Sequence, residues 1–326
     1  MWLSLSPSLL KVRINGQSVC YTRSRKRKRG EKGMASVKRM SLEEFQERFG
    51  TEEKCRKYLE KQRWPEGYVC PKCGAHKCFH LSNGLLQCSV CRHQTSVTAG
   101  TVMQRTHLPL TKWFEALYFV SQDKRGISAV ELQARLGVTY KTAWYLLHRI
   151  RQAMGRSDDQ HQLNGNIEFD DAFFGGPTTG KKRGRGTEKA KVFVALSLDK
   201  KGHPKFLKMK TTKDIRQKSV KGFADRFFGK SSVIFSDGYR SYISALAEYE
   251  HHPRKYDPHS GMLRWLHIVI GNAKAFILGT YHGLPARYLD SYLDEFCFRF
   301  SRRFDGAQLF QRLAFSLAQP SAELKG

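Results

Sequence analysis

The sequence predicts a mixed α/β protein in which a small metal-binding module and a helical region precede a domain built on a sheet. Three observations predict this class. Four cysteines fall in two C-x-x-C units within residues 70–91. Apolar residues at helical spacing follow over residues 109–153. From about residue 165 the period changes, and short strand-like runs separated by turns begin.

Composition limits what this chain can bind. The chain has 326 residues, of which 57 are Lys or Arg and 29 are Asp or Glu, so its formal net charge is +28. A charge of that size and of one sign predicts a polyanionic partner, and nucleic acid is the first candidate. No apolar run approaches the roughly 20 residues that a membrane helix needs. We therefore expect folded domains that bind nucleic acid and no membrane segment.

The first 33 residues carry a basic run, and we expect a disordered arm there. The run "TRSRKRKRGEKG" has no apolar periodicity. Residues 1–33 could be an upstream extension of the reading frame, with Met34 as the natural start, or a tail that grasps DNA. The opening "MWLSLSPSLL" has no small-residue cleavage site, so we interpret it as non-targeting.

A short helical segment is expected over residues 34–65. Apolar residues from Leu42 onward recur at helical spacing, with an interruption at Gly50. Ser41, followed by a glutamate three residues later, fits a capping box at the first helix start. Trp64 and the proline after it end the segment.

A structural zinc site is the strongest local prediction, and it places a zinc ribbon over residues 66–100. Cys70 and Cys73 form one C-x-x-C unit, and Cys88 and Cys91 form the second. Two such units supply four thiolates to a tetrahedral Zn²⁺ and leave no open position for chemistry, whereas a redox dithiol needs only one unit. Metal binding by cysteine is typical of a reducing compartment. The spacing needs none of the other nearby candidate ligands, which are His76, Cys78, His80 and His93.

A helix-turn-helix region that binds DNA is expected over residues 101–160. Ser128 marks a helix start, Gly137 suits the turn, and Thr139 can cap a second helix. A helical hairpin used only for packing has the same spacing, but the net charge favours DNA binding. The second helix carries Lys141, Arg149 and Arg151, and the side chains at its N-terminal end could enter a major groove.

Residues 161–310 have the order of elements expected of a ribonuclease H-like α/β core. Three strand-like runs, "NIEFDDAFF", "KVFVALSL" and "PKFLKMK", precede a helical stretch over residues 214–228 and a fourth run, "SSVIFSD". Two long apolar-periodic segments, "MLRWLHIVIGNAKAFIL" and "ARYLDSYLDEFCFRFSRRF", are predicted to be helices that flank the sheet. Residues 311–326 are expected to form a C-terminal tail.

Two aspartates close strand-like runs in this domain. Asp170 ends "NIEFD" and Asp237 ends "SVIFSD". Carboxylates at strand ends of a buried sheet suit hard divalent cations that act on a phosphodiester, two ions about 4 Å apart. Glu168 shares the face of Asp170 and is a candidate accessory ligand. Asp171 lies on the opposite face, and alternation alone does not choose between it and Asp170.

The chain resembles insertion-sequence DDE transposases, in the branch with an N-terminal zinc ribbon and a catalytic domain that opens on an acidic-Gly-Gly motif. The matching stretches run from about Met40 to Phe304, in order and correctly spaced, and leave out the first 33 residues. They are "LEEFQERFGTEEKCRKYLEKQRWPEGYVCPKCG", "IEFDDAFFGG", "GRGTEKAKV", "SDGYRSY", "GTYHGL" and "YLDEFCFRFSRR".

The resemblance implies catalytic roles for four residues. By position, Asp170 matches the first catalytic aspartate and Asp237 the second. Lys274 matches the basic residue seven positions after the third catalytic position, which is therefore His267. Seven residues are two helical turns, so both side chains project from one face. His stands where most DDE enzymes have Glu, and the branch accepts Glu, Asn or His there. Imidazole suits Mn²⁺ better than Mg²⁺.

Each of these assignments has a competing interpretation. Asp237 could serve only as an Asx-turn residue ahead of a glycine. His267 could be a core histidine, and Asn272 is the runner-up for the third position. Lys274 could be solvated, although it interrupts an apolar helix. The run "GKKRGRGTEK" over residues 180–189 is expected to be a mobile hairpin loop that can grip DNA phosphates.

The resemblance implies a DNA transposase of an insertion sequence, acting in the bacterial cytoplasm at the nucleoid. The zinc ribbon and the helix-turn-helix would bind the terminal inverted repeats, as a homodimer on paired ends. Mg²⁺ or Mn²⁺ would support cleavage at the 3′ ends and strand transfer to target DNA. Two other functions stay open, a DNA-binding protein with an inactive catalytic fold and a structure-selective nuclease.

Overall fold

The computed structural model describes residues 11–14, 17–20, 39–176, 184, 187–255, 257, 260–306 and 308–320. The chain divides into two units, residues 1–36 and residues 37–326. In the first unit, β1 (Lys11–Ile14) pairs antiparallel with β2 (Gln17–Cys20). The basic run and Met34, on which the predictions of a disordered arm and a second start depend, lie outside the described residues.

Two capped helices open the second unit, as the sequence predicts. α1 (Leu42–Phe49) begins where the Ser41 hydroxyl accepts a hydrogen bond from the backbone N–H of Glu44, 3.0 Å away. α2 (Glu52–Arg63) begins in the same way, at the hydroxyl of Thr51. A side chain that satisfies an unpaired N–H stabilises a helix start by about 1 kcal/mol. The local bond at Ser41 explains why the start of α1 is visible in the sequence.

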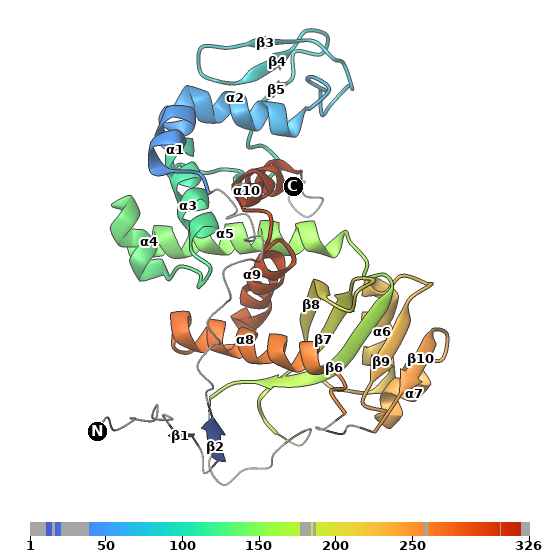
Figure 1. The fold of residues 1–326 in the computed structure, drawn as a ribbon. Helices are drawn as coiled ribbons and strands as arrows, with labels where there is room; N and C mark the ends of the chain where they lie inside the picture. Colours follow the sequence, from blue (N-terminus) through green and yellow to red (C-terminus); the bar gives the residue numbers. More distant parts are fainter. Residues whose placement is uncertain are drawn as a thin grey trace, which may run out of the picture. The chain divides into compact units, whose positions relative to one another are not determined.

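A small antiparallel sheet follows α2 (Figure 1). It contains β3 (Cys78–His80), β4 (Leu86–Cys88) and β5 (Gln94–Thr95), in that order. Gly84 has a φ of 79° in the turn between β3 and β4. Only glycine adopts this conformation without strain, so Gly84 fixes the turn that folds β3 back along β4.

Three helices form the predicted helical region. They are α3 (Leu110–Gln122), α4 (Ala129–Leu136) and α5 (Tyr140–Asp159). The Ser128 hydroxyl caps α4, and Gly137 ends that helix in the left-handed conformation with a φ of 64°. A threonine two residues later caps α5. The start and turn signals of the predicted helix-turn-helix therefore sit where the sequence places them.

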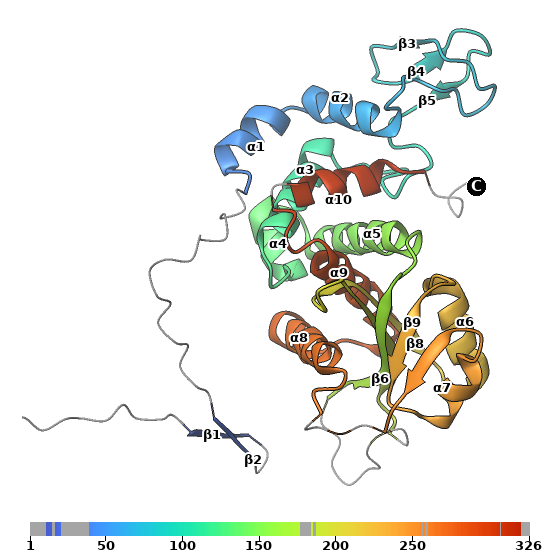
Figure 2. The same ribbon diagram turned by 45° about the vertical axis from the view of Figure 1, so that its right-hand side comes forward.

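A last helix, α10 (Gln308–Ala318), packs among these helices (Figures 1 and 2). Phe310 is buried, and its ring centroid lies 5.0 Å from that of Phe49 and 6.1 Å from that of Phe114. The segment predicted as a C-terminal tail, residues 311–326, therefore begins with packed helix. Its apolar face is buried by residues from the opposite end of the unit, which no local pattern reveals.

A five-stranded sheet forms the centre of the second half, in the order β10-β9-β6-β7-β8. Its strands are β6 (Asn166–Phe174), β7 (Ala190–Leu198), β8 (Pro204–Thr212), β9 (Val233–Ser236) and β10 (Glu250–Pro253). β6, β7 and β8 are successive antiparallel neighbours, while β9 runs parallel to β6 and β10 runs parallel to β9. The four predicted strands are present, and β10 adds a fifth at one edge.

Helices cover both faces of this sheet (Figures 1 and 2). α6 (Gln217–Phe227) and α7 (Arg240–Ala245) share one core with the sheet, whereas α8 (Arg264–Tyr281) and α9 (Leu289–Ser301) share another. A short 3-10 turn, η2 (Ala286–Tyr288), leads into α9. Among the described residues, no helix has both the length and the apolar character that a membrane span needs.

Arg151 on α5 is buried, so it is not among the basic side chains of that helix that are available to DNA. The side chain is buried, with 1% of the residue exposed, and its Nε donates to Glu295 Oε2 on α9 at 2.8 Å. Glu295 also accepts hydrogen bonds from Arg299, 2.9 Å away, and from the Tyr281 hydroxyl, 3.3 Å away. The buried charges therefore join the helical region to α8 and α9. Lys141 remains exposed on α5, as a DNA contact requires.

Candidate active site

Asp170 lies within β6, on the face of the sheet that α8 covers. Its register partner on β7 is Val194, which belongs to the core shared with α8, whereas Asp171 pairs with Phe193 in the core shared with α6. On that opposite face, Asp171 accepts a hydrogen bond from the Tyr242 hydroxyl. Strand alternation therefore separates the two carboxylates, and Asp170 is the one that faces α8.

Asp237 follows β9 directly and lies close enough to Asp170 to affect the pKa of that carboxyl. β6 and β9 are parallel neighbours in which Glu168 pairs with Phe235, and Asp170 and Asp237 each stand two residues beyond that pair. The pKa of Asp170 is raised mainly by burial, and the charges of Asp237 and Asp171 raise it further. Asp237 also accepts from the N–H of Tyr239 at 3.0 Å, so the Asx-turn is present. That turn holds the carboxylate at the strand end.

His267 lies in the first turns of α8 and reaches Asp170. Its Nε2 atom is 3.5 Å from Asp170 Oδ2. The Asp170 side chain is 15% exposed and the His267 side chain 36% exposed, so the pair opens toward solvent at the imidazole. Asn272 is exposed on the same helix, about 140° around its axis from His267. Of the two candidates for the third position, the histidine is the one beside the first aspartate.

Glu168 holds the start of α8, a role that the sequence did not indicate. Its Oε2 atom accepts from the backbone N–H of Leu266, 2.8 Å away in the first turn of the helix. Leu263, the residue before the helix, offers no side-chain cap. Unpaired N–H groups give a helix start a partial positive charge, which a carboxylate stabilises. Glu168 therefore ties the helix that carries His267 to the strand that carries Asp170.

Lys274 lies on α8 two turns after His267. Its ammonium sits 5.7 Å from the ring centroid of Phe174, at the far end of β6. Desolvation lowers the pKa of Lys274, and the like charge of Lys189 lowers it further. A second positive charge nearby makes the surroundings of Lys274 more favourable for an anion. The loop predicted over residues 180–189 lies mostly outside the described residues, so its predicted grip on DNA stays a prediction.

The four cysteines form a ready site for zinc. The Sγ atoms of Cys70 and Cys91 are 3.6 Å apart, as are those of Cys73 and Cys88, and all four lie within 4.8 Å of one another. Tetrahedral Zn²⁺ with bonds near 2.3 Å separates its sulfur ligands by about 3.8 Å. All four are free thiols. Their spacing therefore fits the ion that the sequence predicts.

The carboxylate pair fits a divalent cation for a different reason. Burial and nearby negative charge make the ionised form of Asp170 unfavourable, and a bound cation would remove that cost. In the part of the chain that the structure describes, the cysteines are the only group of three or more ligand atoms within 4.8 Å of one another. Asp170, Asp237 and His267 are therefore spread more widely, as suits ions that also bind water or phosphate oxygens.

Ser236 and Arg254 lie beside the site, and no pattern in the sequence indicated a role for either. Ser236 Oγ lies 2.8 Å from the Nε2 atom of His251 on β10. Arg254 follows β10, and its backbone N–H donates to the Ser236 carbonyl at 3.0 Å. The strand sequence "EHHP" has no apolar alternation, so the sequence does not predict a strand after β9. Parallel pairing with β9 brings Arg254 level with Asp237.

Two protein-family models match this chain. The ISXO2-like transposase domain matches residues 162–301, and the transposase zinc-ribbon domain matches residues 50–94. These two ranges are similar to the two domains of insertion-sequence transposases. The first range contains Asp170, Asp237, His267 and Lys274, and the second contains all four zinc-site cysteines. The family inferred from sequence motifs is confirmed.

The chain is also similar to a protein of a transposable element and, weakly, to a solved structure. The uncharacterized protein in transposable element ISH50 of Halobacterium salinarum (strain ATCC 700922 / JCM 11081 / NRC-1) is 27% identical over 213 residues, which are 60% of this chain and 70% of the relative. The crystal structure of a pre-cleavage Mos1 transpososome is matched at 11% identity with a TM-score of 0.23, over 63% of this chain and 78% of that one.

Proposed function

We propose that this transposase cuts the 3′ ends of its element and transfers the freed ends to target DNA. The observation that carries the proposal is the contact between Asp170 and His267, with Asp237 at the end of the neighbouring strand. All three lie inside the range matched by the transposase domain. The strand order supports a ribonuclease H-like core, because three antiparallel strands are followed by two parallel ones on the far side of the first.

Each residue has a role in this proposal. Asp170 and Asp237 would hold Mg²⁺ or Mn²⁺, which activates the attacking hydroxyl and stabilises the leaving oxygen when bound. His267 Nε2 faces Asp170 Oδ2 and fixes the direction of that carboxylate. Lys274 offers an ammonium to a DNA phosphate. Glu168 keeps α8 in place so that both α8 residues face the strands.

The chemistry consists of two in-line displacements at phosphorus. In the first, water attacks the phosphodiester at the element's 3′ end, the bond from phosphorus to the 3′ oxygen breaks, and a 3′-hydroxyl is released. In the second, that hydroxyl attacks a phosphodiester of target DNA, and one new bond replaces one broken bond. No nucleotide triphosphate is needed, because the number of phosphodiesters is conserved in the second step.

DNA recognition is assigned to the N-terminal half. The zinc ribbon and the helix-turn-helix formed by α4 and α5 would bind the terminal inverted repeats, with Lys141 exposed near the start of α5. A homodimer would pair two ends, in the bacterial cytoplasm at the nucleoid. The net charge of +28 supports DNA as the partner.

The test combines the protein with a duplex that ends in the inverted repeat flanking its reading frame. With Mg²⁺ or Mn²⁺ we expect a nick at the 3′ end and then a joined product. Asp170→Asn and Asp237→Asn should abolish both, while Asp171→Asn, on the opposite face, should keep both. Absence of a nick with either ion would reject the proposal. Nicking of arbitrary branched DNA without joining would instead indicate a nuclease.

A further inference from the structure

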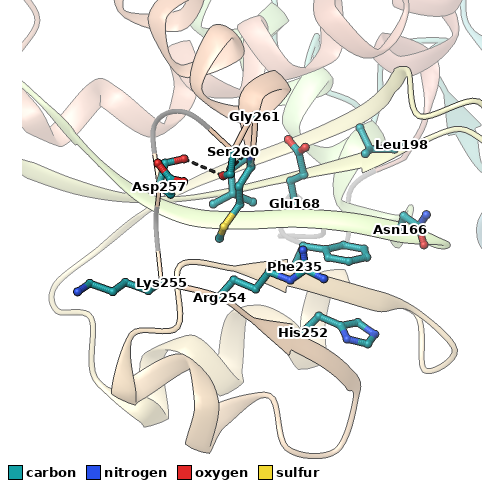
Figure 3. A pocket seen from close by; sticks show the side chains of 12 residues that line it. Asn166, Glu168, Leu198, Phe235, His252, Arg254, Lys255, Asp257, Ser260 and Gly261 are labelled. Carbon is teal, nitrogen blue, oxygen red and sulfur yellow. Dashed lines mark hydrogen bonds between the residues drawn. The ribbon is translucent and has the colours of Figure 1, made fainter.

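An open pocket of about 540 Å³ lies beside the carboxylate pair, on the face of the sheet that α8 covers (Figure 3). Its floor is one row of registered residues from three neighbouring strands. His252 of β10 pairs with Phe235 of β9, which in turn pairs with Glu168 of β6. Its volume is within the range of pockets that hold small molecules.

The pocket begins one side-chain row from the candidate active site. Glu168 precedes Asp170 by two residues on β6, and Phe235 precedes Asp237 by two residues along the chain. Two residues span about 7 Å along a strand and return to the same face. A group in this pocket would therefore sit about one nucleotide from a phosphate held at the carboxylates.

The floor of the pocket is largely aromatic. The rings of Phe235 and His252 stack at a centroid distance of 5.3 Å and an interplanar angle of 19°. Met262 and Leu263, just before α8, add an apolar wall. Flat aromatic surfaces bind nucleobases by stacking, which contributes about 1–3 kcal/mol per base and tolerates any base.

The polar groups of the pocket suit a nucleotide rather than an isolated phosphate. Figure 3 shows the Arg254 side chain extending in the direction of Phe235, whereas Lys255 points away. Within the described ranges, no ion pair or side-chain hydrogen bond engages the Arg254 guanidinium. One carboxylate oxygen of Glu168 accepts a hydrogen bond from the Leu266 N–H, and the other oxygen can accept one from an amino group. The aromatic floor matches the face of a base, the Arg254 guanidinium matches a phosphate, and the Glu168 carboxylate matches an exocyclic amine.

We propose that this pocket holds an unstacked nucleotide of the DNA strand, next to the phosphodiester under attack. Its base would lie on the Phe235–His252 pair, and Arg254 would bind its phosphate. The proposal rests on the proposed function, because it needs a DNA strand at the carboxylates. It adds a binding site that removes one base from the duplex beside the reacting bond.

The experiment places an abasic nucleotide at each position, one at a time, around the cleaved bond of the duplex end. Binding is measured by fluorescence anisotropy with Ca²⁺ in place of the catalytic ion, and nicking is measured in parallel with Mn²⁺. We expect one position at which loss of the base weakens wild-type binding by about tenfold or more. Phe235→Leu should bind the intact end more weakly and should be nearly insensitive to the abasic change at that position.

Two further variants keep the test independent of folding. His252→Ala changes an exposed residue, and we expect a smaller loss at the same position. Phe206→Leu is the matched control, since Phe206 is 43% exposed on β8 at the other edge of the sheet, and it should behave as wild type. The proposal of a nucleotide pocket would be refuted by an equal loss of binding affinity at every abasic position. It would also be refuted if the abasic change weakened binding of Phe235→Leu as much as that of wild type. Absence of nicking alone would reject the proposed function and leave the binding result to decide the pocket.

Discussion

Glu295→Gln is expected to destabilise the fold more than any loss of an exposed ion pair. Glu295 is 1% exposed and is the counter-charge for two guanidinium groups, those of Arg151 and Arg299, which are 1% and 9% exposed. Burial by itself raises the pKa of Glu295, but the two arginine charges lower it overall. The native state therefore holds an ionised carboxylate in the interior between two cations.

Removing that charge leaves two buried cations without an anion. Loss of one partner from a buried pair typically costs about 3–5 kcal/mol, and here the upper part of that range is expected. Because the folded pKa of Glu295 is lowered, its stabilisation is complete above the unfolded pKa and is lost as the pH falls through the folded pKa. The variant should therefore lose most stability near neutral pH, still lose much of it at pH 4, and lose little only below the lowered pKa of Glu295.

Glu131→Gln is the matched control for this prediction. Glu131 pairs with Arg135 at 2.7 Å, close to the 2.8 Å of the Arg151–Glu295 pair, but its side chain is 52% exposed. Exposed pairs one helical turn apart contribute only about 0.3–0.5 kcal/mol. The free energy of unfolding is measured by urea titration followed by circular dichroism at pH 7 and pH 4. Equal, small losses in both variants would refute the argument from burial.

Four other predictions follow from the structure. Chelation of zinc, or Cys88→Ser, should unfold the zinc ribbon. Binding to the DNA end should then be lost, while the melting transition of the sheet domain should stay unchanged. Glu168→Ala should lower stability by about 1–2 kcal/mol and slow nicking, because the start of α8 loses its cap, while Glu168→Gln should keep more of both. Asp170→Asn should stabilise the metal-free fold above the folded pKa of Asp170, since a raised carboxyl pKa means that stability falls as the pH rises, yet nicking should vanish. Lys274→Ala should weaken end binding, and Lys274→Arg should restore it; unchanged binding in Lys274→Ala would rule out a phosphate contact.

Features set by local chemistry could be predicted from the sequence. The caps at Ser41, Ser128 and Thr139 and the left-handed turn at Gly137 depend on bonds within one helical turn. The cysteine site depends on spacing alone, because each C-x-x-C unit places two thiolates together. The strand bounds followed from apolar runs bounded by turn residues, as at Gly202 before β8.

Features set by tertiary partners could not be predicted. β10 has a polar sequence, so only its pairing with β9 identifies it as a strand. Arg151 looks like a DNA contact on a basic helix, and only the distant Glu295 shows that it is buried. Phe310 gives no sign of its core role without the helices it packs against.

The candidate site shows the same division. Asp237 stands at the end of β9 as the sequence predicts, and motif spacing chose His267. The expectation that Asp170 closes a strand is wrong, because apolar residues continue β6 to Phe174 and leave Asp170 in the middle of the strand. The role of Glu168 was not visible, because it depends on an N–H of α8 that lies 98 residues further along the chain. Strand alternation did not choose between Asp170 and Asp171, so the motif match alone favoured Asp170; the structure adds that Asp170 lies on the face that α8 covers.

The central claim is that side chains from β6, the end of β9 and α8 share divalent cations. Electron paramagnetic resonance of bound Mn²⁺, with zinc-loaded protein on a duplex end, counts those ions directly. We predict bound Mn²⁺ in wild type and in Asp171→Asn, and its loss in Asp170→Asn and Asp237→Asn. Equal Mn²⁺ binding in all four proteins would contradict the account.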